Sequence, residues 1–222
     1  MDPQKQPEKA RVIGLGLEQV DEAADLLTPV FLDSPLDHYI LEGLGPERRN
    51  ILASSFKMDC LWKLGMGWPL LGVLENGKLA AVALVIGCQP SQGGMAEYQG
   101  GRLTLARLQE MEDRLDRSFG PQTCARILEY YSLRDAHKPR EPHLYIESLA
   151  ALPEHRGKGY GGLLIDFISR LSENDGASTG VALDTQDPVN LALYQHFGYR
   201  VTGQGAIWPV DNWFLFRPNA QN

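Results

Sequence analysis

The segment "LPEHRGKGYGG" (Leu152–Gly162) decides how the rest of the chain is interpreted. It contains four glycines and two cationic residues, Arg156 and Lys158. The run before it, His143–Leu152, has the apolar character of a strand. The run after it has apolar residues at helical spacing, at Leu163, Leu164, Phe167, Ile168 and Leu171. The pattern therefore predicts a strand, a glycine-rich loop and a helix, with bare backbone and positive charge at the loop.

Two kinds of nucleotide-binding loop fit this segment poorly. A Walker-type phosphate loop needs Ser or Thr after its lysine, and Gly159 follows Lys158. A dinucleotide fold is favoured by the G-x-G-x-x-G spacing of Gly157, Gly159 and Gly162 and by Asp184 about 20 residues further on. However, four residues separate the strand from the first glycine, and about 40 residues remain after Asp184, too few for the further parallel strands of that fold.

The third interpretation is an R-x-x-G-x-G signature made by Arg156, Gly159 and Gly161. The block "YIESLAALPEHRGKGYGGLLI" resembles the acetyl-CoA-binding strand, loop and helix of the GNAT superfamily of N-acetyltransferases. The block "LDTQDPVNLALYQHFGYRVTG" resembles that superfamily's next strand, helix and strand. The segments "HKPREPHLYIE" and "PVFLDSPLDHYI" further resemble the branch that includes puromycin-type acetyltransferases.

The order of expected elements is mixed α/β within one domain. Asn76-Gly77 predicts a tight hairpin turn between two apolar runs, and Gly120-Pro121 separates two expected helices, Thr104–Arg117 and Gln122–Leu133. The resemblance implies a GNAT fold with a central mixed sheet of about six or seven strands, a splayed parallel pair and flanking helices. Residues 11–218 are expected to form this domain and residues 1–10 a disordered tail.

The glycine segment suits an acyl carrier with a pyrophosphate, such as acetyl-CoA. Backbone N–H groups at a helix N-terminus are unpaired and favour anions, and glycines leave them accessible. The resemblance implies that residues 149–151 pair with the pantetheine arm like an added strand. Solvated surface is the alternative for the two cations, and a tight turn is the alternative for the glycines. Acetyl-CoA contacts are expected at Leu149, Ala150, Ala151, Arg156, Gly157, Lys158, Gly159, Tyr160, Gly161, Gly162 and Asn190.

Glu147 is the candidate general base. Strand alternation places it on one face with Tyr145, Leu149 and Ala151. Its carboxylate could take a proton from the acceptor's ammonium, directly or through water, and partial burial would raise its pKa toward neutrality. A structural ion pair is the alternative role.

Tyr194 is the candidate general acid. It lies one helical turn after Asn190, so both side chains project from one face of their helix. The resemblance implies that Asn190 binds the pantetheine or pyrophosphate region and that Tyr194 protonates the departing sulfur. A core aromatic residue is the alternative for Tyr194. Attack is expected to be direct, in a ternary complex, since the sequence has no convincing Cys–His pair for a covalent intermediate.

Composition indicates which kinds of partner this protein is expected to bind. The formal net charge is -7, from 21 Lys+Arg and 28 Asp+Glu, which disfavours nucleic acid. Three widely spaced cysteines favour a reduced, cytoplasmic protein, and no metal-ligand spacing or membrane-length apolar run is present. A homodimer is compatible with the resemblance.

The acceptor is expected to be the amine of a small molecule or peptide. Its pocket is expected among the N-terminal helices and the last hairpin, with candidates at Asp33, Asp37, His38, Tyr39, Trp208 and Trp213. A non-catalytic acyl-CoA sensor and a dinucleotide oxidoreductase remain the alternatives to an acetyltransferase.

Overall fold

The computed structural model describes residues 10–88, 97–98, 101–155 and 157–220. The strands are β1 (Arg11–Gly14), β2 (Leu70–Glu75), β3 (Lys78–Ile86), β4 (Glu97–Tyr98), β5 (Gly101–Arg102), β6 (Leu144–Ala151), β7 (Gly180–Thr185), β8 (Arg200–Ile207) and β9 (Val210–Pro218). The α-helices are α1 (Val20–Phe31), α2 (Pro35–Ile40), α3 (Arg48–Met66), α4 (Leu105–His137), α5 (Tyr160–Asn174) and α6 (Val189–His196). Short 3₁₀ turns occupy Leu17–Gln19, Gly45–Glu47 and Pro153–His155.

Turn residues explain the reversal of the chain between β2 and β3 and the break within α4. Asn76 (φ 53°) and Gly77 (φ 77°) both adopt positive φ between β2 and β3, which confirms the predicted hairpin. Gly120 interrupts α4 with φ 76° and ψ 165°, a conformation essentially restricted to glycine, directly before Pro121. The two helices expected on either side of Gly120 are therefore the two halves of α4.

Seven strands form one sheet in the order β1-β2-β3-β6-β7-β9-β8. Within the described strands, β6 and β7 are the one parallel pair, and the other neighbours are antiparallel. The parallel pairing covers Leu144–Ile146 against Val181–Leu183, although β6 continues to Ala151. The expected mixed sheet with a splayed parallel pair is thus confirmed.

A β-bulge lies where the two parallel strands separate. On the β3 side, Leu84 faces Ser148 and Val85 faces Ile146, so Glu147 is an extra residue in β6. A bulge of this kind resets the alternation of side chains along the strand.

The bulge makes one prediction about β6 wrong. Glu147 and Tyr145 contact groups from α3 and α4, whereas Leu149 and Ala151 pack in the cluster that includes α5. The four residues therefore do not share a face, because simple alternation fails at Glu147. Like Tyr145, Glu147 faces the helical layer that contains α1–α4, and the bulge places Leu149 and Ala151 on the opposite face.

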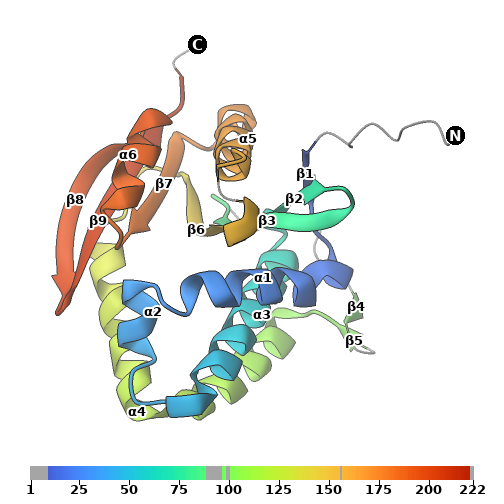
Figure 1. Ribbon diagram of the computed structural model, residues 1–222, viewed down its shortest axis with the longest axis vertical. Helices are drawn as coiled ribbons and strands as arrows, with labels where there is room; N and C mark the ends of the chain where they lie inside the picture. Colours follow the sequence, from blue (N-terminus) through green and yellow to red (C-terminus); the bar gives the residue numbers. More distant parts are fainter. Residues whose placement is uncertain (1–9, 89–96, 99–100, 156, 221–222) are drawn as a thin grey trace, which may run out of the picture.

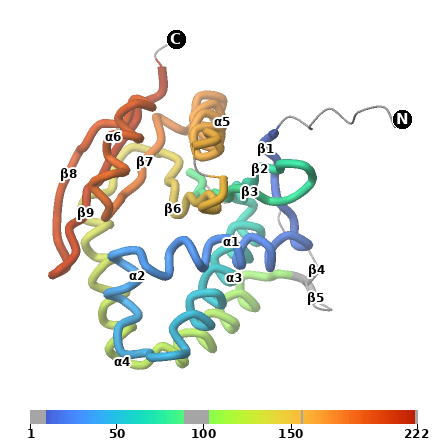
Figure 2. Tube along the Cα trace, in the orientation of Figure 1, coloured from blue at the N-terminus to red at the C-terminus, as the bar shows by residue number. Residues whose placement is uncertain are grey.

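Helices cover both faces of the sheet (Figure 1). The core between the sheet and α1–α4 includes Leu27, Leu61, Leu84 and Leu108, all fully buried. A second core, formed with α5 and α6, includes Leu164, Ile168, Val181 and Tyr199. Figure 2 shows how the trace of β6 leaves that of β7 beside α5, with α1 and α2 passing below. No helix in the described ranges has the length and apolar character needed to cross a bilayer.

Candidate active site

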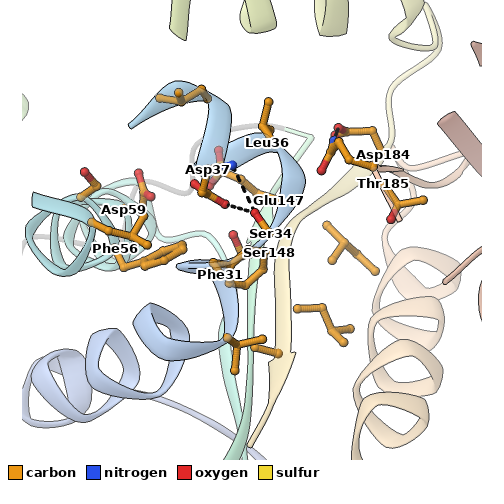
Figure 3. A pocket seen from close by; sticks show the side chains of 18 of the residues that line it. Phe31, Ser34, Leu36, Asp37, Phe56, Asp59, Glu147, Ser148, Asp184 and Thr185 are labelled. Carbon is orange, nitrogen blue, oxygen red and sulfur yellow. Dashed lines mark hydrogen bonds between the residues drawn. The ribbon is translucent and has the colours of Figure 1, made fainter. Parts of the chain in front are cut away.

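A cavity of about 1040 Å³ occupies the space where β6 and β7 separate. One wall consists of residues 146–151 of β6, the glycine segment, the end of β7 and the start of α6. Helices α1–α4 form the other wall. Figure 3 shows Asp37, Asp59 and Glu147 on one side of this space and Asp184 with Thr185 on the other. Apart from Lys158, the described residues expected to hold an acyl carrier line this cleft together with Glu147 and Tyr194, which are expected to act on it.

The glycine segment forms the turn into α5. Gly157 and Gly159 have φ of 79° and 80°, so a side chain would be strained at either position. Gly161 and Gly162 belong to the first turn of α5, where backbone N–H groups have no partner within the helix. All four line the cavity. Arg156, the first residue of the predicted signature, lies outside the described residues.

A carboxylate that sequence reasoning missed holds this turn in place. Glu75, the last residue of β2, accepts hydrogen bonds from Lys158 Nζ at 2.9 and 3.0 Å and from the Tyr160 hydroxyl at 2.5 Å. His155 Nδ1 lies 3.0 Å from the same carboxylate. Hydrogen bonds from Tyr160 and then from Lys158 lower the pKa of Glu75. Lys158 therefore contacts Glu75 while remaining beside the helix N-terminus.

Glu147 is neutralised by two cations. Lys63 Nζ forms an ion pair with one carboxylate oxygen, and Arg134 lies 3.7 Å from the other. The Lys63 side chain is 4% exposed and that of Glu147 is 20% exposed. The structure thus shows the ion pair that was the alternative role for Glu147. A sequence signal existed, because Lys63 follows Phe56 and Cys60 at helical spacing along the buried side of α3.

The α6 residues lie as their spacing predicted. Asn190 and Tyr194 both line the cavity, and Asn190 Nδ2 is 3.4 Å from the Thr185 hydroxyl at the end of β7. Tyr194 is 8% exposed, and burial, followed by the charge of Asp184, raises its pKa to about 12. Its hydroxyl therefore keeps its proton at neutral pH.

Asp184 ties α4 to the end of β7. It accepts hydrogen bonds from the Tyr130 hydroxyl at 3.1 Å, from the Tyr145 hydroxyl, and from Gln186 Nε2 at 2.6 Å. Burial raises the pKa of Asp184, although these hydrogen bonds oppose the shift. The network spans α4, β6 and β7, and Tyr130 and Asp184 line the cleft.

Two of the six acceptor-pocket candidates line the cleft. Asp33 and Asp37 do so. His38 instead contacts Arg48, Tyr39 contacts Arg126 and Glu129, Trp208 is 86% exposed, and Trp213 packs in the α5-side core.

A further carboxylate, Asp59 on α3, also lines the cleft and was missed by sequence reasoning. Burial is the main cause that raises its pKa to about 7, and the charge of Glu147 adds to the shift. Burial likewise raises the pKa of Asp37 to about 6, against a hydrogen bond from Ser34. Burial removes both carboxyl groups from water and disfavours their charged forms, so ionisation of either group lowers the stability of the protein without a ligand.

We expect Asp59→Asn to stabilise the protein at high pH. The folded-state pKa of about 7 exceeds the ordinary 3.8, so the unfolded chain loses this proton first and stability falls as pH rises between these values. Asparagine escapes that penalty, and the gain in unfolding free energy should be about 1–3 kcal/mol at pH 8 and near zero at pH 4. Urea unfolding at both pH values measures it. Asp166→Asn, on the exposed side of α5, should show no such pH-dependent difference. Equal stability of Asp59→Asn and wild type at pH 8 would contradict the assignment.

Known proteins share this architecture. The acetyltransferase (GNAT) family matches residues 67–199, more than half of the chain. The structure of a histone acetyltransferase HPA2 and related acetyltransferase from Corynebacterium glutamicum superposes with a TM-score of 0.65 at 15% identity, covering 96% of this chain and 98% of that one. An agmatine N-acetyltransferase mutant gives 0.61 at 13% identity, covering 94% and 98%. An N-acetyltransferase from Staphylococcus aureus gives 0.56 at 17%, covering 93% and 99%.

At these identities the structural similarities show a shared fold, whereas the family match shows a relationship in sequence over residues 67–199. The matched residues include the hairpin β2–β3, strand β6, the glycine turn, α5, β7 and α6. Placement in the puromycin-type branch stays a prediction. The chain belongs to the GNAT family of acetyltransferases.

Proposed function

We propose that this protein transfers the acetyl group of acetyl-CoA to a primary amine of a small molecule or peptide, by direct attack in a ternary complex. One observation carries the proposal. The cleft between β6 and β7 continues from the glycine turn, where a diphosphate fits, to a second chamber among α1–α4, where an acceptor fits. The homodimer and the cytoplasmic location suggested by the sequence stay predictions.

The residues present fit acetyl-CoA along its length. The diphosphate would meet the backbone amides of the glycine turn and of the first turn of α5, within Gly157–Gly162, and Lys158 lies beside them in its ion pair with Glu75. The backbone of Leu149–Ala151 has β3 on one side and the cavity on the other, so it can pair with pantetheine as a strand would. Asn190 faces the same space. Arg156 and Tyr160 complete the predicted set.

The reaction forms a C–N bond and breaks a C–S bond. The acceptor enters as an ammonium, loses one proton, and its neutral nitrogen attacks the thioester carbonyl. Coenzyme A leaves as a thiolate, and Tyr194 donates its phenolic proton to that sulfur; the second proton of the attacking nitrogen then restores the phenol. The Tyr194 hydroxyl is protonated at neutral pH, as a proton donor must be, while its raised pKa of about 12 makes it a weaker acid than an ordinary tyrosine.

Glu147 has two candidate roles, and its ion pairs support the structural one. Lys63 and Arg134 already pair with the two carboxylate oxygens, so both oxygens are engaged before an acceptor enters. As an anchor, Glu147 holds α3 and α4 against the bulge of β6. Water in the cleft then carries the first proton away from the ammonium.

Calorimetric titration tests the cofactor half of the proposal. Acetyl-CoA should bind and NADH should not. Gly161→Val should weaken acetyl-CoA binding by about 100-fold or more, because its methyl groups would cover the amides that the diphosphate needs. The variant should fold, since Gly161 lacks positive φ and a Cβ there meets Leu149 at an ordinary 3.5 Å. Gly159 is a poorer probe because its φ of 80° adds backbone strain.

Gly176→Val is the matched control, because a Cβ at Gly176 meets nothing within 4 Å. It should bind acetyl-CoA like wild type. A folded Gly161→Val protein with wild-type affinity would show that the turn is not the diphosphate site. Tight NADH binding would favour the oxidoreductase.

Release of free thiol from acetyl-CoA tests the chemistry. Tyr194→Phe should lower kcat by about 10- to 1,000-fold while leaving the KM for acetyl-CoA nearly unchanged, as expected for loss of a general acid. Tyr199→Phe is the matched control: its ring packs 5.8 Å from that of Tyr194, and its buried hydroxyl has no hydrogen-bond partner among the described residues. Unchanged turnover in Tyr194→Phe would reject the acid role. Tight acetyl-CoA binding without thiol release for any amine would favour the sensor.

Glu147→Gln separates the two roles of Glu147. Loss of an anchor leaves Lys63 buried without its partner, so unfolding free energy should fall by about 2–3 kcal/mol, less than for a fully buried pair. The acid limb of the pH profile of kcat/KM should survive. Glu173→Gln, which breaks the Arg217 pair at the protein surface, should cost less than about 1 kcal/mol. Disappearance of the acid limb in Glu147→Gln would instead identify Glu147 as the base.

A further inference from the structure

The chamber among α1–α4 is lined by more carboxyl groups than cationic side chains. Its lining carboxylates, apart from Glu147, are Asp33, Asp37, Asp59, Glu112 and Asp116. Arg134 is the one Lys or Arg side chain among the described residues that line this chamber, and it lies 3.7 Å from Glu147. The described ion pairs include none to Asp59, Glu112 or Asp116. An incoming cation would therefore meet carboxylates without an ion pair among the described residues, although the charge of Arg48 favours ionisation of Asp37 and that of Lys63 favours ionisation of Asp59.

Asp59 and Asp37 are the carboxylates that a cation would relieve most. Burial is the largest influence on both groups, and it disfavours their charged forms. Asp59 also lies in the field of Glu147, Glu112 and Asp37, which opposes its ionisation, while Lys63 favours it. A bound cation would stabilise the charged forms of both carboxylates through charge-assisted hydrogen bonds. An arrangement that costs stability when empty is typical of a binding site.

The walls between these carboxylates are apolar and aromatic. Phe31 and Phe56 pack with ring centroids 5.2 Å apart, and both line the chamber beside Leu52 and Phe119. Such walls suit an apolar spacer and the face of an organic cation. The described His, Cys, Asp and Glu side chains form no group of three or more placed to hold a metal ion. The chamber therefore fits an organic cation better than a metal.

The chemistry of attack adds a second requirement. The nitrogen that attacks acetyl-CoA is neutral at that moment, so it cannot balance these carboxylates. A positive group elsewhere on the acceptor can. Resting on the proposed function, we propose that the acceptor is a dication: a primary amine joined by an apolar spacer to a second amine or guanidine group, which Asp59 and Asp37 bind.

Matched acceptors test this inference on the wild-type enzyme. Thiol release is measured at pH 8 with 1,4-diaminobutane and 1,6-diaminohexane, and with 4-amino-1-butanol and 6-amino-1-hexanol. Each amino alcohol has the length of its diamine and lacks the second charge. The kcat/KM of the better diamine should exceed that of its amino alcohol by about 10- to 100-fold, the range expected for a hydrogen bond to a charged group. Equal values for both pairs would overturn the inference and leave the acetyltransferase proposal standing.

Variants assign the charge selectivity to residues. Asp59→Asn and Asp37→Asn should each reduce the diamine-to-amino-alcohol ratio, mainly through a higher KM for the diamine. Asp59→Asn is the sharper probe, because we expect it to be more stable than wild type at this pH, so a lower ratio cannot be ascribed to unfolding. Asp166→Asn, on the exposed side of α5, should keep the wild-type ratio. An unchanged ratio in both Asp59→Asn and Asp37→Asn would overturn the assignment.

A binding measurement keeps the two proposals separable. Diamine is titrated into the protein saturated with coenzyme A, and the amino alcohol is the control. Diamine binding that depends on Asp59, without thiol release, would support the dication site and overturn the acetyltransfer. Equal thiol release with a diamine and with its amino alcohol would support acetyl transfer and overturn the dication site.

Discussion

Strands β6 and β7 pair through Ile146 and Leu183 and then separate, and the other features of the cleft depend on that separation. Two parallel strands would normally continue their ladder. Here the bulge at Glu147 bends β6 while β6 stays paired with β3 as far as Ala151. One edge of residues 147–151 is thereby left beside the cavity, available to a ligand that can pair as a strand. Glu147 faces the helices, on the same side of β6 as Tyr145, and Lys63 and Arg134 pair with its carboxylate there.

A separated pair of strands needs support from outside the sheet, and two polar clusters provide it. At the glycine turn, Glu75 gathers Lys158, Tyr160 and His155 and so joins the β2–β3 hairpin to the start of α5. Near the end of β7, Asp184 joins this strand to α4 through Tyr130 and to β6 through Tyr145. In both clusters a carboxylate from a strand end receives donors from a helix or a neighbouring strand. The cleft is therefore bordered by fixed elements before any ligand arrives, which reduces the ordering cost of binding.

The carboxylates of the cleft fall into two kinds that differ in their surroundings. Glu147 and Asp184 are satisfied by cations or hydroxyl donors, and they hold elements together. Asp59 and Asp37 form no ion pair among the described residues, and burial raises their pKa values although the charges of Lys63 and Arg48 oppose the shift. Burial disfavours the charged forms of Asp184, Asp59 and Asp37 alike, but Asp184 accepts several hydrogen bonds that oppose this effect, and the cation proposed above would offset it at Asp59 and Asp37. The same cleft thus holds structural and functional acids at neighbouring positions.

Much of the fold and part of the site could be predicted from the sequence, because those features depend on near neighbours. The Asn76-Gly77 turn, the break at Gly120, the glycine turn before α5 and the helical spacing of Asn190 and Tyr194 are all local. Asp59 and Lys63 left a local signal as well. Two charged residues occupy positions of the buried stripe on α3 that contains Phe56 and Cys60.

What the tertiary structure decided depends on partners far away in the chain. The bulge exists only against β3, so alternation within β6 alone misplaced Leu149 and Ala151 relative to Glu147. Glu75 lies 83 residues before Lys158, and no spacing rule connects them. The sequence by itself thus determined the family, the turn and the order of elements, since these follow from local backbone preferences. The charge state and the partners of each side chain in the cleft were decided only by folding, because burial and electrostatic pairing arise when distant elements meet.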